Sequence, residues 1–215
     1  HVVIATGCTW RRDGVGRTHW QPIPGFDDAG RVFTPDDLMD GRMPEGPVVV
    51  YDDDGFYHAS VMADALALAG RDVVLATPED TIAPWSVNTL DYRHIQWRLA
   101  ELGVRQCVAH EAVALEAGGL RVRHVWNGEE QVLPCAAVVT VTSRLPVDAL
   151  YHDLVAREAD WADAGVRSVR RIGDAEAPGL IAHAVYAGHR YARELDAAPE
   201  GEVPFKRHFH VPQAD

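Results

Sequence analysis

The middle of the chain alternates between short apolar runs and stretches with helical spacing. Val48–Tyr51 and Val73–Ala76 are continuous, largely aliphatic runs of the kind found in strands that are buried on both faces. Between them, residues 58–69 carry apolar positions at helical spacing and end at Gly70. A second helix is expected over 88–102, and a third strand over 104–108. This order of strand, helix, strand, helix, strand predicts an α/β fold with a doubly wound parallel sheet.

The pattern changes over residues 110–142. Runs at 110–115, 120–126 and 131–141 alternate or are apolar, and they are separated by Gly118-Gly119 and Asn127-Gly128. An Asn-Gly pair between two such runs is a strong hairpin signal. We expect an antiparallel meander attached to the parallel sheet.

The two ends of the chain form a separate group of predicted elements. Residues 2–5 predict a short strand that ends at Thr6-Gly7, and residues 8–33 read as a long connection rich in turn residues. Thr34 is a good N-cap for a short helix with Pro35 at its first position. Further on we expect a helix near 147–158, a strand over 166–172, and a long helix from Pro178 to about Leu195.

Two loops in these end segments, Ala5-Thr6-Gly7 and Gly173-Asp174-Ala175, are candidates for contact with a nucleotide. Gly173-Asp174-Ala175 joins a predicted strand to a helix, and a helix N-terminus offers unpaired N–H groups to phosphate oxygens. Asp174 has the right chemistry to accept hydrogen bonds from sugar hydroxyls. The alternative is that Asp174 and Glu176 only stabilise the helix dipole at a surface turn.

The turn after Val48–Val50 lacks a dinucleotide fingerprint. A conventional turn would read G-x-G-x-x-G, whereas here Asp52-Asp53-Asp54 is followed by the single glycine Gly55. Three carboxylates would repel a bound pyrophosphate, and each close pair of unit charges would make binding less favourable by ~1 kcal/mol in water. NAD(P) is therefore not expected. The consecutive spacing is also wrong for a calcium loop, so we expect a solvated acidic turn and no metal.

Composition narrows the class of partner. The chain has 215 residues, 47% hydrophobic and 24% charged, and a formal net charge of -12. That charge disfavours nucleic acid and anionic membranes. Cys8, Cys107 and Cys135 form no C-x-x-C, which indicates reduced thiols in a cytoplasmic protein. No run is long enough to span a membrane, and no nucleophile arrangement stands out, so we name no catalytic residue.

Several segments, taken in order, resemble the C-terminal third of the trimethylamine dehydrogenase family, which includes dimethylamine and histamine dehydrogenases. The family belongs to the NADH:flavin oxidoreductase, old yellow enzyme-related superfamily. The resemblance covers essentially the whole chain and is carried by Thr6-Gly7…Trp10, Pro22–Gly25, Thr34-Pro35…Met39–Gly41, Arg157-Glu158…Trp161-Ala162, Ile172–Pro178 and Pro204–Arg207.

This resemblance implies an incomplete FAD-like domain with an inserted Rossmann-like, NAD(P)-type domain, as in the glutathione reductase-like class. The FAD/ADP-binding-like part would comprise residues 1–45 and 143–200, the insert with its meander residues 46–142, and a tail residues 201–215. ADP or FAD would contact Ala5, Thr6 and Gly7 together with Gly173, Asp174 and Ala175.

The resemblance also implies a larger enzyme. Its N-terminal (β/α)8 barrel would carry FMN and a 4Fe-4S cluster, oxidise a small amine, and pass electrons to electron-transferring flavoprotein; the enzyme would form a homodimer. Two rivals remain. One is an NAD(P)H-dependent dienoyl-CoA or enoate reductase of the same architecture, and the other is a stand-alone nucleotide-sensing or docking module without catalysis.

Overall fold

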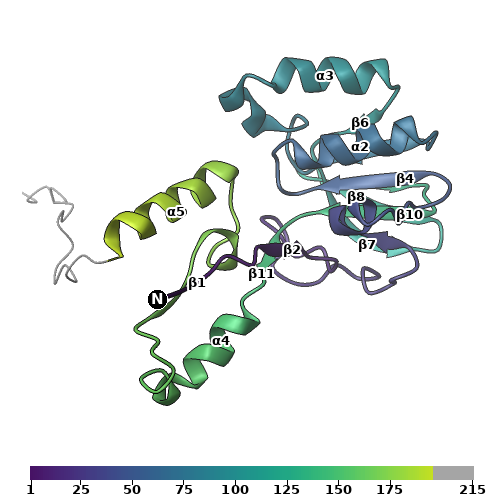
Figure 1. The fold of residues 1–215 in the computed structure, drawn as a ribbon. Helices are drawn as coiled ribbons and strands as arrows, with labels where there is room; N and C mark the ends of the chain where they lie inside the picture. Colours follow the sequence, from purple (N-terminus) through teal and green to yellow (C-terminus); the bar gives the residue numbers. More distant parts are fainter. Residues whose placement is uncertain (196–215) are drawn as a thin grey trace, which may run out of the picture. The chain divides into compact units, whose positions relative to one another are not determined.

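The computed structural model describes residues 1–195, which form two compact units (Figure 1). Among the described residues, the first unit contains His1–Gly7 and residues 148–195, and the second contains Cys8–Val147. The predicted tail at 201–215, including Pro204–Arg207, lies outside the described residues. The domain limits predicted at residues 45 and 142 stay a prediction. The two units are defined by contacts between residues, whereas the predicted domains are defined by the cofactor that each would bind.

The second unit is built on a five-stranded parallel sheet with the order β3-β10-β4-β5-β6. Its strands are β3 Val32–Phe33, β4 Val48–Asp52, β5 Val73–Ala76, β6 Arg105–Cys107 and β10 Ala137–Val141. Helices α2, His58–Leu68, and α3, Tyr92–Glu101, follow β4 and β5 respectively. The predicted parallel α/β sheet is confirmed.

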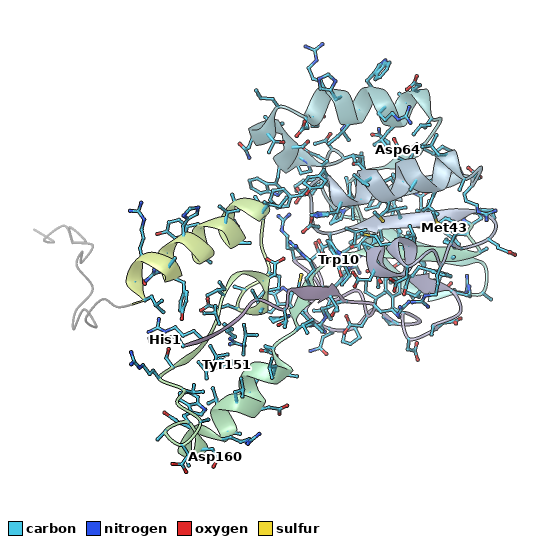
Figure 2. The ribbon with its side chains drawn as sticks, in the orientation of Figure 1. His1, Trp10, Met43, Asp64, Tyr151 and Asp160 are labelled. Atoms are coloured by element: carbon cyan, nitrogen blue, oxygen red, sulfur yellow. The ribbon has the colours of Figure 1, made fainter. Side chains whose placement is uncertain are left out.

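The sheet buries both faces, which explains its apolar runs. Side chains alternate along a strand, so Val48 and Val50 of β4 pack in a core cluster with α2, whereas Val49 and Tyr51 pack in a second cluster with the meander. Trp10, labelled in Figure 2, packs against the margin of the first cluster.

The meander is a separate three-stranded antiparallel sheet. Its strands are β7 His110–Glu116, β8 Gly119–His124 and β9 Glu130–Leu133. The expected single run over 131–141 was wrong, because it divides at Pro134. Proline cannot donate to a strand ladder, and the fully buried residues that follow form β10 inside the parallel sheet.

Other predicted bounds also changed. The connection 8–33 contains β2, Cys8–Trp10, which pairs with β11, Arg144–Pro146, and also β3. The helix expected from residue 88 begins at Tyr92, because Leu90 adopts a left-handed conformation (φ 66°) after a 3-10 helix at Pro84–Thr89. The helix α1, Pro35–Met39, has the predicted Thr34 cap, completed by a reciprocal bond with Asp37.

The first unit is smaller. Strands β1, Val2–Ile4, and β12, Val169–Arg171, form a two-stranded parallel sheet. Helix α4 spans Ala149–Ala156 and α5 spans Ile181–Glu194, with 3-10 turns at Glu158–Asp160 and Gly173–Ala175. Within the described chain, no helix is both long and apolar enough to cross a membrane.

Candidate functional site

The two predicted nucleotide loops follow neighbouring parallel strands. β1 ends at Ile4 and β12 at Arg171, which are paired in register, and the Ile172 N–H donates to the Ile4 carbonyl at 2.9 Å. The segments Ala5–Gly7 and Gly173–Ala175 therefore leave the same edge of the sheet. That edge, at the carboxyl ends of parallel strands, is where open α/β folds bind ligands.

Both loops use glycine for their shape. Gly7 has φ 79° and open space over its Cα, and Gly173 has φ 60° with Ala184 of α5 within van der Waals reach. A side chain would be strained at either position. Ala5 and Thr6 are exposed, whereas Ala175 is fully buried beneath the loop.

Asp174 holds the path from this loop into the last helix. Its Oδ1 accepts the Gly179 N–H at 3.0 Å. The helix begins at Ile181, so the expected start at Pro178 was wrong: Leu180 is still extended (ψ 159°). The imidazole Nδ1 of His183 accepts the Leu180 N–H at 3.1 Å. Asp174 is thus partly a loop-shaping residue, and both its contact with a nucleotide and its effect on the helix dipole stay predictions.

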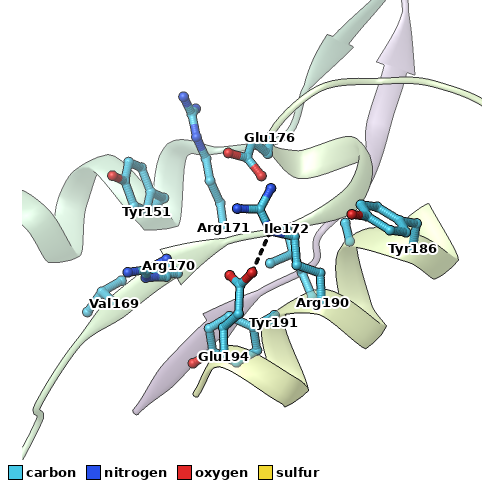
Figure 3. Close-up of a pocket in the computed structure, with 11 residues that line it drawn as sticks. Tyr151, Val169, Arg170, Arg171, Ile172, Glu176, Tyr186, Arg190, Tyr191 and Glu194 are labelled. Carbon is cyan, nitrogen blue, oxygen red and sulfur yellow. Dashed lines mark hydrogen bonds and ion pairs between the residues drawn. The ribbon is translucent and has the colours of Figure 1, made fainter. Parts of the chain in front are cut away.

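A cavity of about 520 Å³ lies beside this loop, between β12 and α5 (Figure 3). Arg171 from β12 pairs with Asp148 and lies 4.9 Å from the ring centroid of Tyr151. Arg190 from α5 pairs with Glu194 at 2.9 Å. Both of these guanidinium groups are thus already paired with carboxylates of the same unit.

Sequence reasoning missed the cavity-lining residues. Arg170-Arg171 occur in a strand, and Tyr186 and Arg190 are four residues apart on one helix face. Side chains at this spacing are neighbours on a helix. That spacing was the available signal, but nothing in the sequence placed the helix face against the arginines of the strand.

The acidic turn of the second unit is not solvated, which corrects the expectation. Asp52 is fully buried and Asp53 is 3% exposed. Asp52 Oδ1 accepts the N–H groups of Asp54 at 3.1 Å and Gly55 at 2.9 Å. The Asp52 carboxyl group faces inward because β4 is buried on both faces up to this last residue, and Asp53 is held by bonds from Thr18.

Burial raises the pKa of Asp52 to about 7. The bond from the Gly55 N–H partly offsets this effect, while the neighbouring charges of Asp54 and Asp53 add to it. The second oxygen of Asp52 has no protein partner. Asp54 instead accepts from His58, whose Nδ1 lies 3.1 Å away on the first turn of α2.

The arrangement of metal-ligating and thiol side chains can be examined in the part of the chain that the structure describes. No group of three or more His, Cys, Asp or Glu side chains is placed to hold a metal ion there. Cys8, Cys107 and Cys135 form no disulfide bond in the structure. Burial raises the pKa of Cys107 and of Cys135, which makes both thiols less reactive.

Comparison with known proteins extends these observations. No protein-family model matches the chain. Dimethylamine dehydrogenase of Hyphomicrobium sp. (strain x) is 34% identical over 227 residues, which cover 96% of this chain and 31% of the relative.

Two solved structures match closely. Histamine dehydrogenase from Rhizobium sp. 4-9 has a TM-score of 0.90 and 45% identity, over 100% of this chain and 33% of that one. The 6-hydroxypseudooxynicotine amine oxidase from Pseudomonas geniculata N1 has a TM-score of 0.83 and 42% identity, over 88% of this chain and 28% of that one.

The parallel sheet with its meander, the paired strand-end loops and these matches give the chain the fold of the dinucleotide-type domains of flavoprotein oxidoreductases. Within that class it is a homologue of part of the dimethylamine and histamine dehydrogenases, and it spans about a third of their length. The predicted fold class and family resemblance are confirmed.

Proposed function

We propose that this chain is the nucleotide-binding-type portion of an iron–sulfur flavoprotein amine dehydrogenase. The observation that carries the proposal is similarity along nearly the whole chain, at 34% and 45% identity, to dimethylamine and histamine dehydrogenases. The whole protein would oxidise a small amine at FMN and pass the electrons to electron-transferring flavoprotein. FMN and the 4Fe-4S cluster would reside in a preceding (β/α)8 barrel.

In this proposal the first unit holds ADP or FAD. Gly7 fits such a role, because its positive φ and the open space over its Cα let a ligand approach the backbone closely. Ala5, Thr6, Gly173 and Ala175 would supply backbone contacts beside it, and Asp174 would accept from a sugar hydroxyl. A bound nucleotide would supply binding energy and order to the loops, with no proton transfer from these residues.

The first unit also supports the existence of a larger partner. Among residues 1–7 and 148–195, only Ile4, Val169 and Ala175 are buried. Helix α5 has no buried residue, and Ile181 is 74% exposed. A folded unit stabilises itself by removing apolar surface from water. We therefore propose that the barrel-bearing part of the same protein covers this unit, in a homodimeric enzyme. The three cysteines form no disulfide bond, which agrees with a cytoplasmic setting.

Anaerobic titration of the whole protein tests this function. Addition of a panel of primary, secondary and tertiary amines should bleach the flavin absorbance, and electron-transferring flavoprotein should then restore it. Neither NADH nor NADPH should bleach the flavin. Bleaching by NADPH and by none of the amines would instead identify a reductase of the same architecture.

A further inference from the structure

One short segment of the second unit, Val15–Thr18, crosses the carboxyl ends of three neighbouring parallel strands; we refer to it as the strap. After β10, Ser143 Oγ donates to the Val15 carbonyl at 2.5 Å. After β4, Asp53 accepts the Thr18 N–H at 2.8 Å and the Thr18 hydroxyl at 2.7 Å. After β5, Glu79 pairs with Arg17 at 3.1 Å.

The strap packs directly over the glycine of the acidic turn. A Cβ added to Gly55 would lie 2.9 Å from Trp85 Cδ1 and 3.0 Å from Arg17 Nη1. The Arg17 guanidinium lies 5.8 Å from the Trp85 ring centroid, and the backbone N–H of Trp85 donates to the Gly55 carbonyl at 3.2 Å. In a dinucleotide fold, the bare face of such a glycine is where pyrophosphate approaches the backbone. Here an indole and a guanidinium fill that face.

The backbone N–H groups of the acidic turn already donate to acceptors within the protein. The N–H of Asp53 donates to the Val141 carbonyl at 2.9 Å, and the N–H of Gly55 donates to the Asp52 carboxyl group. The N–H of Asp54 lies within reach of both acceptors. A phosphate would have to displace these internal acceptors to gain the same bonds.

We propose that the strap is a built-in lid that closes the dinucleotide crevice of the second unit. Internal carboxyl and carbonyl oxygens occupy the turn amides, and Arg17 and Trp85 occupy the space above the glycine. The unit then keeps a nucleotide-type fold without using a dinucleotide. This inference concerns the second unit alone and does not depend on which amine, if any, the whole protein oxidises.

Trypsin cleavage after Arg17 tests the lid. The whole protein is digested under native conditions, and mass spectrometry follows the peptide that begins at residue 18. The triple variant Thr18→Val, Glu79→Gln, Ser143→Ala removes one anchor at each strand while nearly preserving side-chain volume. We expect cleavage after Arg17 to be slow in the wild type and at least about tenfold faster in the triple variant, because local opening exposes the bond.

Two controls make the result decisive. Glu116→Gln, which removes an ion pair with Arg121 in the meander, should leave cleavage after Arg17 unchanged. Addition of NADH at roughly 1 mM, the upper end of ordinary Michaelis constants, should also leave the wild-type cleavage rate unchanged. Equal rates in the wild type and the triple variant would show that the strap does not close the crevice. A wild-type rate altered more than about twofold by NADH would show that the strap opens for a dinucleotide, and either result overturns the proposal.

Discussion

The Asp53 carboxylate accepts both the backbone N–H and the side-chain hydroxyl of Thr18, at 2.8 and 2.7 Å, across 35 positions of sequence. These two bonds join the turn after β4 to a segment that sequence alone marks only as a connection. The stability lost when these two bonds are removed therefore reports how strongly Asp53 holds the strap.

Replacing Asp53 with alanine should lower the free energy of unfolding by about 1–3 kcal/mol, since hydrogen bonds to a charged acceptor are lost. Urea denaturation followed by circular dichroism measures this change. Asp72→Ala is the matched control: its carboxylate is 61% exposed and pairs with Arg105 at the surface. The control should change stability by less than about 1 kcal/mol. Equal losses in both variants would contradict the structural role of Asp53.

Gly16→Ala should loosen the same contact by a steric route. A Cβ at this position would lie 2.4 Å from Asp53 Oδ2 and 3.0 Å from Thr142 Cβ. Overpacking of this kind costs about 1–3 kcal/mol, which a fall in the melting temperature would report. Gly118→Ala is the control, because it has open space and no positive φ. If both variants melt at the wild-type temperature, the strap is not packed against Asp53.

Stability should depend on pH through Asp52. Its folded pKa, about 7, lies above the ordinary value of 3.8, so the unfolded chain releases a proton that the folded chain keeps. Stability from this group is fully present below pH 3.8 and is lost as pH rises through 7. Between pH 5 and 8, the free energy of unfolding should fall by roughly 2–3 kcal/mol relative to Asp52→Asn. Urea titrations at several pH values give the two curves, and parallel curves would exclude this assignment.

Asp174→Asn tests the predicted nucleotide site. The amide keeps an oxygen for the Gly179 N–H, so the loop should remain intact, while the negative charge offered to a sugar hydroxyl is lost. Calorimetric titration of the whole protein with ADP should show binding about tenfold weaker, because hydrogen bonds to charged groups are the stronger ones. Asp163→Asn, an exposed acid of the same unit, should bind ADP like the wild type. Unchanged affinity in Asp174→Asn would remove Asp174 from the site.

Helix α2 offers a matched pair for the core. Leu66 is fully buried and Leu68 is 65% exposed on the same helix. Leu66→Ala should cost about 2–5 kcal/mol in unfolding free energy, whereas Leu68→Ala should stay within about 0.5 kcal/mol. Chemical denaturation compares them. Similar losses would mean that a partner covers Leu68 in the whole protein.

The sequence predicts those elements whose signals are local. The run Val73–Ala76 has the predicted bounds, and Thr34 caps its helix, because apolar continuity and a short polar side chain before proline act within a few residues. Pro134 is a local signal for a break between β9 and β10. The apolar residues on both sides of it nevertheless read as one run, so the change from the meander to the parallel sheet was not predicted.

The inward-facing acids and the strap were not predictable in the same way. Three consecutive aspartates ordinarily favour solvent. Asp52 is buried because it ends β4 at the centre of the sheet, and Asp53, the next residue, is held by donors from residue 18. The cavity beside β12 likewise depends on where α5 packs. Such features come from contacts between distant segments, which a single sequence does not reveal.

The contact of Arg17 and Trp85 with Gly55 has a consequence for engineering this fold. Adding glycines to the turn after β4 would restore the sequence motif of a dinucleotide fingerprint but would not create a binding site. The space would still be filled, and the amides would still be bonded to Asp52 and the Val141 carbonyl. Regaining a cofactor would require the strap, the indole and the buried acid to change together, so the loss of the site is difficult to reverse by single substitutions.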